Sequence, residues 1–208
     1  MEVTTDATSE RILEAARDEL FSFGIRRTTV EGIARRAGVS HMTVYRRWPA
    51  KNDLLLAVVI REIEGLFAAV DREVGALDDP EDKLVAGFVG IYSFARAHPL
   101  LGHALETDPE SVLPIFTSGA GPSIELATNY LAGHIERAAG TGDSAAARSL
   151  AEIFVRLTQS LLLTPRPEAL ATRPEVEAYA RQHLLPLART VIASDQVAAK
   201  ASDQVAAK

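Results

Sequence analysis

A short segment near the N-terminus constrains the fold more than any other part of the chain, because it encodes two short helices joined by a tight turn. Thr28 or Thr29 can cap a first helix that runs to Ala37, since a hydroxyl at this position accepts from an N–H of the first turn. Gly38 then suits the left-handed conformation that ends a helix, and Ser40 can cap the next helix. Helices of this length are not stable by themselves. The pair must therefore pack on longer helices, which indicates a helical domain at this end of the chain.

The apolar residues of the same segment predict which side of each helix is buried. The inner positions of the helix pair are taken by Ile33, Ala37, Val39 and Val44. At about 100° per residue, Trp48 lies on the same side of the second helix as Val44. Met42 and Arg46 lie nearly opposite. The second helix is therefore expected to have one packed side and one outward side.

Charge is unevenly distributed along the chain of 208 residues, whose formal net charge is −6. Residues 25–51 contain seven basic residues against one acidic residue, Glu31, and so carry +6, which leaves −12 for the remainder. A basic segment on an acidic protein is the electrostatic signature of a local polyanion site. A solvated basic surface would have the same composition. The basic residues coincide with the two short helices, and this favours a nucleic-acid binding site over a merely solvated surface.

If the polyanion is DNA, the second helix is the element that enters the major groove. His41 lies at its N-terminus, where side chains meet base edges, while Arg46 suits guanine and Met42 suits a thymine methyl. Nearby hydroxyl and ammonium groups suit phosphates. The predicted DNA-contacting residues are Thr28, Thr29, Ser40, His41, Met42, Thr43, Tyr45, Arg46 and Lys51. Arg35 and Arg36 suit either a phosphate contact or a solvated surface.

The rest of the chain also has helical patterns, so the predicted fold class is all-α. An opening helix is expected that Thr8 or Ser9 caps and that Gly24 ends. Later helix starts have a capping residue or glycine followed by proline: Asp79-Pro80, Asp108-Pro109 and Gly121-Pro122. Long amphipathic helices are predicted over residues 51–77, 144–163 and 174–193. No segment has the alternation and turn of a β-hairpin.

Sequence patterns for catalysis, metal binding and membrane insertion do not occur. The chain has no cysteine, which excludes a thiolate nucleophile and fits the cytoplasm. His98, His103 and Glu106 are five and three residues apart, unlike the i, i+4 pair of a helical zinc site. There is no phosphate-binding glycine loop, no nucleophile elbow, no apolar run of about 20 residues and no secretory signal in the polar N-terminus. We therefore expect no enzyme activity, metal, cofactor or membrane association.

One continuous run, TTVEGIARRAGVSHMTVYRRWPAKNDLL, resembles the DNA-binding signature of the tetracycline-repressor (TetR) family. With the helix before it, the likeness covers about residues 9–56. The resemblance implies a three-helix, helix-turn-helix DNA-binding head over residues 1–50, and a larger helical ligand-binding and dimerisation domain over residues 51–193. Residues 194–208 form a tail in which the sequence ASDQVAAK is duplicated.

The resemblance also implies a function, namely a homodimeric transcriptional repressor that a small-molecule effector releases from a double-stranded DNA operator. Dimerisation would use the helices at 144–163 and 174–193. The effector pocket of such proteins lies among the central helices, where the candidates are Phe88, Tyr92, Phe116 and Tyr130, each equally suited to plain packing. One alternative is a DNA-binding regulator without a small ligand. A small helical enzyme or carrier is a weaker alternative, because neither needs a helix pair with a basic outer face.

Overall fold

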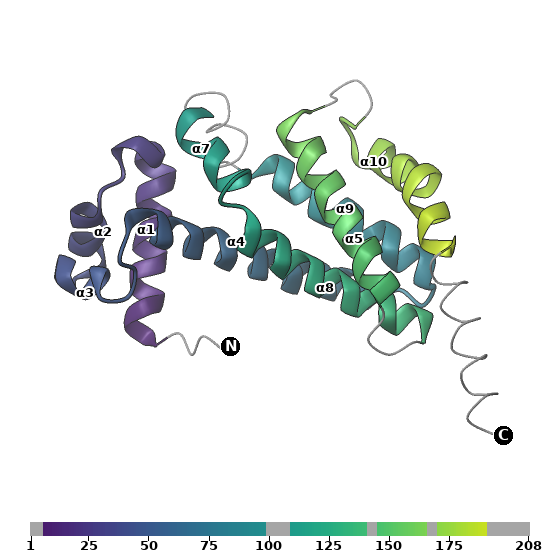
Figure 1. Cartoon of the computed structure of the whole chain (residues 1–208), viewed down its shortest axis with the longest axis horizontal. Coiled ribbons are helices and arrows are strands. Elements are labelled where there is room, and N and C mark those ends of the chain that lie inside the picture. Colours follow the sequence, from purple (N-terminus) through teal and green to yellow (C-terminus); the bar gives the residue numbers. More distant parts are fainter. Residues whose placement is uncertain (1–5, 99–108, 141–144, 166–169, 191–208) are drawn as a thin grey trace. The chain divides into compact units, whose positions relative to one another are not determined.

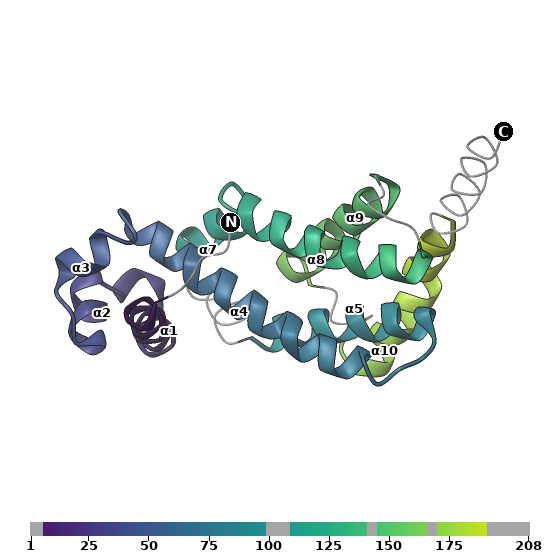
Figure 2. The same ribbon diagram turned by 90° about the horizontal axis from the view of Figure 1, so that it is seen from below.

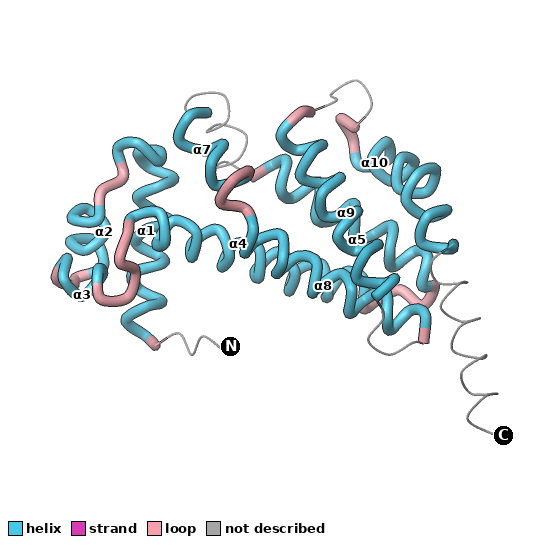
Figure 3. The backbone as a smooth tube through the Cα atoms, in the orientation of Figure 1, coloured by secondary structure: helices cyan, strands magenta, loops and turns pink. Residues whose placement is uncertain are grey.

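The computed structural model describes residues 6–98, 109–140, 145–165 and 170–190, and every regular element in these ranges is a helix (Figures 1 and 3). No strand occurs among them. This confirms the all-α prediction. Packing divides the chain into two compact units, which both include part of the long helix α4, Lys51–Val74.

Unit 1 comprises Met1–Glu64 and Ala97–Ala120, and unit 2 comprises Gly65–Arg96 and Gly121–Lys208. Helix α4 begins at Lys51, as predicted, and ends at Val74, three residues before the expected end. The proposed division between DNA-binding residues 1–50 and ligand-binding residues 51–193 concerns function, so it stays a prediction.

The helices of unit 1 are α1 Ala7–Arg27, α2 Val30–Ala37, α3 His41–Tyr45, the first part of α4, and α7 Pro109–Phe116. Asp6 caps α1, since its carboxylate accepts from the N–H of Ser9 at 2.7 Å. The predicted caps, Thr8 and Ser9, were wrong because α1 begins before them. Gly24 interrupts α1 with φ +74° at the position where an end was predicted, and helical residues continue to Arg27.

Apolar sides of the first four helices meet in the core of unit 1. The fully buried residues at its centre are Ile12, Ala16, Ile33, Val44 and Leu54. Val39 and Trp48 pack at the margin of this core. Burial of a large aliphatic side chain contributes about 1.5–3 kcal/mol. Packing on α1 and α4 therefore stabilises two helices that are too short to persist alone.

Unit 2 contains the rest of α4 and the later helices: α5 Pro80–Ala97, α8 Gly121–Ala139, α9 Ala145–Leu163, α10 Arg173–Tyr179, the π-helical turn η1 Ala180–Leu184, and α-helical residues 185–190. Helices α8 and α9 pack side by side in both views (Figures 1 and 2). Asp79 caps α5, as predicted, because its carboxylate accepts from two first-turn N–H groups at 2.9 Å each. The predicted start at Asp108, the end at 193 and the tail lie outside the described residues.

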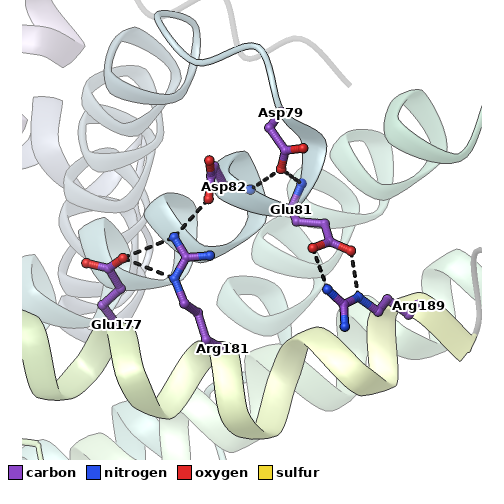
Figure 4. Close-up of polar contacts among 6 residues, drawn as sticks. All are labelled: Asp79, Glu81, Asp82, Glu177, Arg181 and Arg189. Carbon is purple, nitrogen blue, oxygen red and sulfur yellow. Dashed lines mark hydrogen bonds and ion pairs between the residues drawn. The ribbon is translucent and has the colours of Figure 1, made fainter.

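The π-helical turn aligns two arginines that hold the last helical segment against the start of α5 (Figure 4). At about 100° per residue, eight residues of regular α-helix would place Arg181 and Arg189 about 80° apart around the axis. A π turn takes up one extra residue and reduces this offset to about 20°. Arg181 thereby pairs with Asp82 at 2.8 Å, and Arg189 pairs with both oxygens of Glu81 at 2.6 Å.

Candidate DNA-binding site

Two side-chain caps and a glycine set the turn between α2 and α3. The hydroxyl of Thr29 accepts from the N–H of Gly32 at 3.0 Å, so Thr29 is the cap of α2. Gly38 follows α2 in the left-handed region, with φ +66° and ψ +37°. The hydroxyl of Ser40 accepts from the N–H of Thr43 at 3.2 Å and begins α3. The helix-turn-helix predicted for this segment is therefore present.

Helix α3 has one packed side and one outward side. Val44 is fully buried in the core of unit 1. Met42 is 66% exposed, and His41, Tyr45 and Arg46 are also exposed. The rings of His41 and Tyr45 meet edge to face, with centroids 6.4 Å apart. The outward side thus offers a guanidinium, an imidazole, a phenol and a thioether for recognition.

Two of the seven basic side chains in this region are paired with acidic residues of the N-terminal segment. Arg36 bonds to Glu19 at 3.0 Å, and Arg47 bonds to Asp6 at 2.8 Å and to the hydroxyl of Ser9 at 2.9 Å. These arginines position helices within unit 1. Among the described residues, the basic side chains of this region with no hydrogen bond or ion pair are Arg26, Arg35 and Arg46.

Asp6 connects the start of α1 with the residues after α3. The backbone N–H of Ser9, and next the side chain of Arg47, hold the pKa of Asp6 at about 2, against an ordinary 3.8. The carboxylate therefore stays ionised at neutral pH and keeps Arg47 in place. Sequence reasoning missed this contact because Asp6 and Arg47 are 41 residues apart.

The structure shows the surroundings of two residues that were predicted to contact DNA, Thr28 and Lys51. Thr28 is 1% exposed, and its hydroxyl donates to the carbonyl of Gly24 at 2.8 Å. The backbone N–H of Thr28 donates to the same carbonyl at 3.2 Å, so Thr28 is the C-terminal cap of α1, and its burial corrects the prediction that its hydroxyl contacts DNA. The ammonium of Lys51 donates to the carbonyl of Ile25 at 2.7 Å, so it is held near the end of α1. A phosphate contact by Lys51 stays a prediction.

The candidate ligand-binding aromatics fall into separate groups. In unit 2, Phe88 and Tyr92 stack with centroids 6.0 Å apart, and Phe88 also faces Tyr179 at 6.3 Å. Tyr130 instead stacks on Phe67 at 3.8 Å, with the rings 4° from parallel. Phe116, the fourth candidate, is a half-buried residue at the end of α7 in unit 1.

Tyr130 belongs to a polar cluster with Asp71 and His134. Its hydroxyl donates to the carboxylate of Asp71 at 2.7 Å, and Nε2 of His134 lies 2.9 Å from the same oxygen. Partial burial and this hydrogen bond raise the pKa of Tyr130 above its ordinary value. Burial, and next the charge of Arg137, lower the pKa of His134 and outweigh Asp71. Both groups are thus held in their neutral forms at neutral pH.

Thr128 is a buried polar residue that sequence reasoning missed. It is 2% exposed, and its hydroxyl has no hydrogen-bond partner among the described residues. It precedes Ala132 by one helical turn and Ile135 by two, so all three lie on one face of α8. That spacing is visible in the sequence and is the signal that locates Thr128 in the core.

The described residues contain no group of three or more His, Cys, Asp or Glu placed to hold a metal ion. His103 and Glu106 lie outside the described residues. No helix in the described part of the chain is long and apolar enough to span a membrane.

The all-helical fold and the outward side of α3 define a helix-turn-helix DNA-binding protein. Comparison with known proteins identifies the family. Residues 12–58 match bacterial regulatory proteins of the tetR family, and residues 79–182 match the C-terminal domain of the bacterial tetracyclin repressor. The chain belongs to the TetR family of transcriptional regulators.

Individual relatives agree with this assignment. An uncharacterized HTH-type transcriptional regulator of Mycobacterium bovis is 33% identical over 157 residues, which are 74% of this chain and 80% of the relative. The TetR family repressor AlkX of Dietzia sp., implicated in biodegradation of n-alkanes, has a solved structure with a TM-score of 0.71 and 21% identity, covering 88% of this chain and 95% of that one. The structure of RolR in complex with resorcinol has a TM-score of 0.65 and 16% identity, covering 90% and 94%.

Proposed function

We propose that this regulator is a homodimeric repressor whose α3 helices bind an operator and whose unit 2 binds a small-molecule effector that releases the DNA. The observation that carries the proposal is the outward side of α3, where Met42 is 66% exposed and Arg46 has no protein partner among the described residues. A large apolar side chain beside an unpaired arginine suits the mixed surface of a base-pair edge.

The proposed contacts are of two kinds. His41, Met42 and Arg46 read base edges, because they lie on the outward side of α3. Phosphates are bound by hydroxyl groups and one ammonium group: those of Thr29, Ser40, Thr43, Tyr45 and Lys51. Thr29 and Ser40 cap helix N-termini, where the partial positive charge also attracts phosphate.

Exposed apolar residues on the last helices support the proposed homodimer. Ile153 of α9 is 54% exposed, and Leu187 of the last helical segment is 48% exposed. In a dimer with two-fold symmetry the same surface of each copy meets the other, so Ile153 and Leu187 of both copies would be buried in the interface. The two α3 helices would then contact half-sites about 34 Å apart along the DNA, or a multiple of that distance.

The proposed effector site is the aromatic core of unit 2 around Phe88 and Tyr92, with Tyr130 of the same unit as a further candidate; Phe116 belongs to unit 1 and stays a separate candidate. The resorcinol complex of RolR supports the idea that a helical domain of this fold can hold a small molecule. Helix α4 contributes to both units, so a change in its tilt can alter the spacing of the α3 helices in the dimer. The effector releases DNA only if it binds more tightly to the state in which the spacing of the α3 helices does not match the operator. The operator must then weaken effector binding by the same factor by which the effector weakens operator binding.

Arg46→Ala tests the DNA-binding assignment, with Arg72→Ala as the control. Both residues are exposed arginines, but Arg72 lies on α4 in unit 2. Arg46→Ala should weaken binding to the selected operator by about 1–3 kcal/mol and relax the base preference at one position. Arg72→Ala should leave both unchanged. Fluorescence anisotropy on the operator and on single-base variants measures this, and equal behaviour of the two variants would contradict the proposal.

A further inference from the structure

Three buried hydroxyl oxygens in unit 2 have no hydrogen-bond partner among the described residues, and two of them belong to fully buried residues. These two are the phenol of Tyr92 on α5, which is 1% exposed, and the hydroxyl of Thr128 on α8, which is 2% exposed. The third is on Ser123 of α8, a residue that is only half-buried. A buried polar group without a partner destabilises a protein, so such groups are rare. Their presence in one core requires a physical explanation.

Other residues of the same chain show that these hydroxyl groups could have been satisfied locally. Two helical threonines, Thr158 at 2.8 Å and Thr190 at 3.0 Å, donate to the carbonyl four residues earlier, and Thr117 in the turn after α7 does the same at 2.6 Å. Thr128 lies in a helix, as Thr158 and Thr190 do, and does not make this bond. Half-buried Tyr130 has a carboxylate partner, while fully buried Tyr92 has none. Within the described part of unit 2, the two most buried residues with a side-chain hydroxyl are thus both without a partner for it.

The surroundings of both groups are apolar. Tyr92 belongs to a core that includes Ala132 and Ile135, and Thr128 lies on the same face of α8 as those two residues. Phe88 stacks beside Tyr92. No charged side chain is buried in unit 2 among the described residues. A charged ligand group would therefore lose its water there without gaining an opposite charge. A neutral oxygen of a ligand would instead meet two hydroxyl groups, each of which can donate and accept a hydrogen bond.

We infer that the hydroxyl groups of Tyr92 and Thr128 are the polar contacts for an uncharged effector, a mainly apolar molecule with a hydroxyl or carbonyl oxygen. This inference rests on the proposed effector site and specifies its chemistry. The effector forms the hydrogen bonds that these two hydroxyl groups lack in the free protein. The protein should therefore bind it more tightly than an analogue without the oxygen and more tightly than a carboxylate analogue.

The first test is the stability of the full chain without ligand. Tyr92→Phe and Thr128→Val remove unpartnered hydroxyl groups and should leave the melting temperature unchanged or raise it. The matched controls, Tyr130→Phe and Thr158→Val, remove bonded hydroxyl groups and should lower it. If Tyr92→Phe and Thr128→Val lowered the melting temperature as the controls do, the hydroxyl groups would have protein partners and the inference would be overturned.

The second test uses phenol, benzene and benzoate as probes of similar size, measured by isothermal titration of the free protein. Phenol should bind at least about fivefold more tightly than benzene, the factor expected from one net hydrogen bond, and benzoate should bind most weakly. The double variant Tyr92→Phe/Thr128→Val should lose the preference for phenol, and the control double variant Thr158→Val/Thr190→Val, which removes two bonded hydroxyl groups outside the proposed site, should keep it. Absence of phenol binding, equal binding of phenol and benzene, or preferred benzoate would overturn the inference. Because no DNA is present, these outcomes are independent of operator binding, which is tested separately through Arg46.

Discussion

Replacing Gly38 with alanine tests the turn between α2 and α3 without disturbing a packing contact. Gly38 has φ +66° and ψ +37°, and a methyl group built on it would meet no atom within 4 Å. The substitution therefore changes backbone energy alone. Gly65 of α4 is the matched control, because its added methyl group also meets nothing within 4 Å and its φ is that of an ordinary helix.

The expected effects have opposite signs. The left-handed conformation costs alanine about 1–2 kcal/mol, and the smaller freedom of alanine in the unfolded chain returns about 0.4–1 kcal/mol. Gly38→Ala should thus lower the free energy of unfolding by about 0.8 kcal/mol, the difference between the middles of these two ranges. Gly65→Ala should raise it by about 0.5–1 kcal/mol, because alanine is favoured in a helix interior.

Urea denaturation measures both changes. Trp48 is the single tryptophan and packs at the margin of the unit 1 core, so its fluorescence reports on unfolding around the Gly38 turn. Far-UV circular dichroism reports on the helices and is the readout for Gly65→Ala. A Gly38→Ala variant as stable as the unmodified protein would refute the argument that the left-handed turn requires glycine, as would shifts of the same sign in both variants.

Three further predictions concern the core, the pH dependence of stability and the dimer. Val44→Ala removes two methyl groups from a fully buried site and should lower the free energy of unfolding by about 2 kcal/mol in urea titrations; a change below about 0.5 kcal/mol would contradict the packing of α3. Burial and the charge of Arg137 lower the pKa of His134 in the folded protein, so the unfolded chain binds more protons. The stability that the neutral His134 contributes is therefore fully present above the ordinary pKa of 6.5 and decreases as the pH falls toward the lower folded pKa. His134→Gln should flatten the dependence of the urea midpoint on pH, and an unchanged slope would argue against this. Ile153→Asp should convert the proposed homodimer to a monomer in sedimentation velocity, whereas a variant that stays dimeric would exclude α9 from the interface.

Residues within one or two helical turns of each other were the most predictable part of the candidate site. Thr29, Gly38 and Ser40 act on atoms no more than four residues away, so their types and spacing indicated the turn between α2 and α3. The burial of Val44 on a wheel of about 100° per residue followed in the same way.

Partners far apart in the chain could not be predicted in this way. Arg36 and Arg47 contributed to a basic segment in the sequence, but packing brings Glu19 and Asp6 beside them from 17 and 41 residues away. The hydroxyl of Thr28 had the chemistry of a phosphate contact, yet Thr28 caps the end of α1 and is 1% exposed.

The sequence by itself determined the all-helical class, the helix-turn-helix and the family, because helix periodicity, caps and left-handed glycines are local properties of the chain. The tertiary structure alone decided which aromatic hydroxyl group is satisfied: α4 brings Asp71 to Tyr130, while Tyr92 is enclosed by apolar neighbours. It also decided that a π turn aligns Arg181 and Arg189 with the first turn of α5. Side-chain partners depend on how helices pack, and packing is set by the whole core rather than by any one segment.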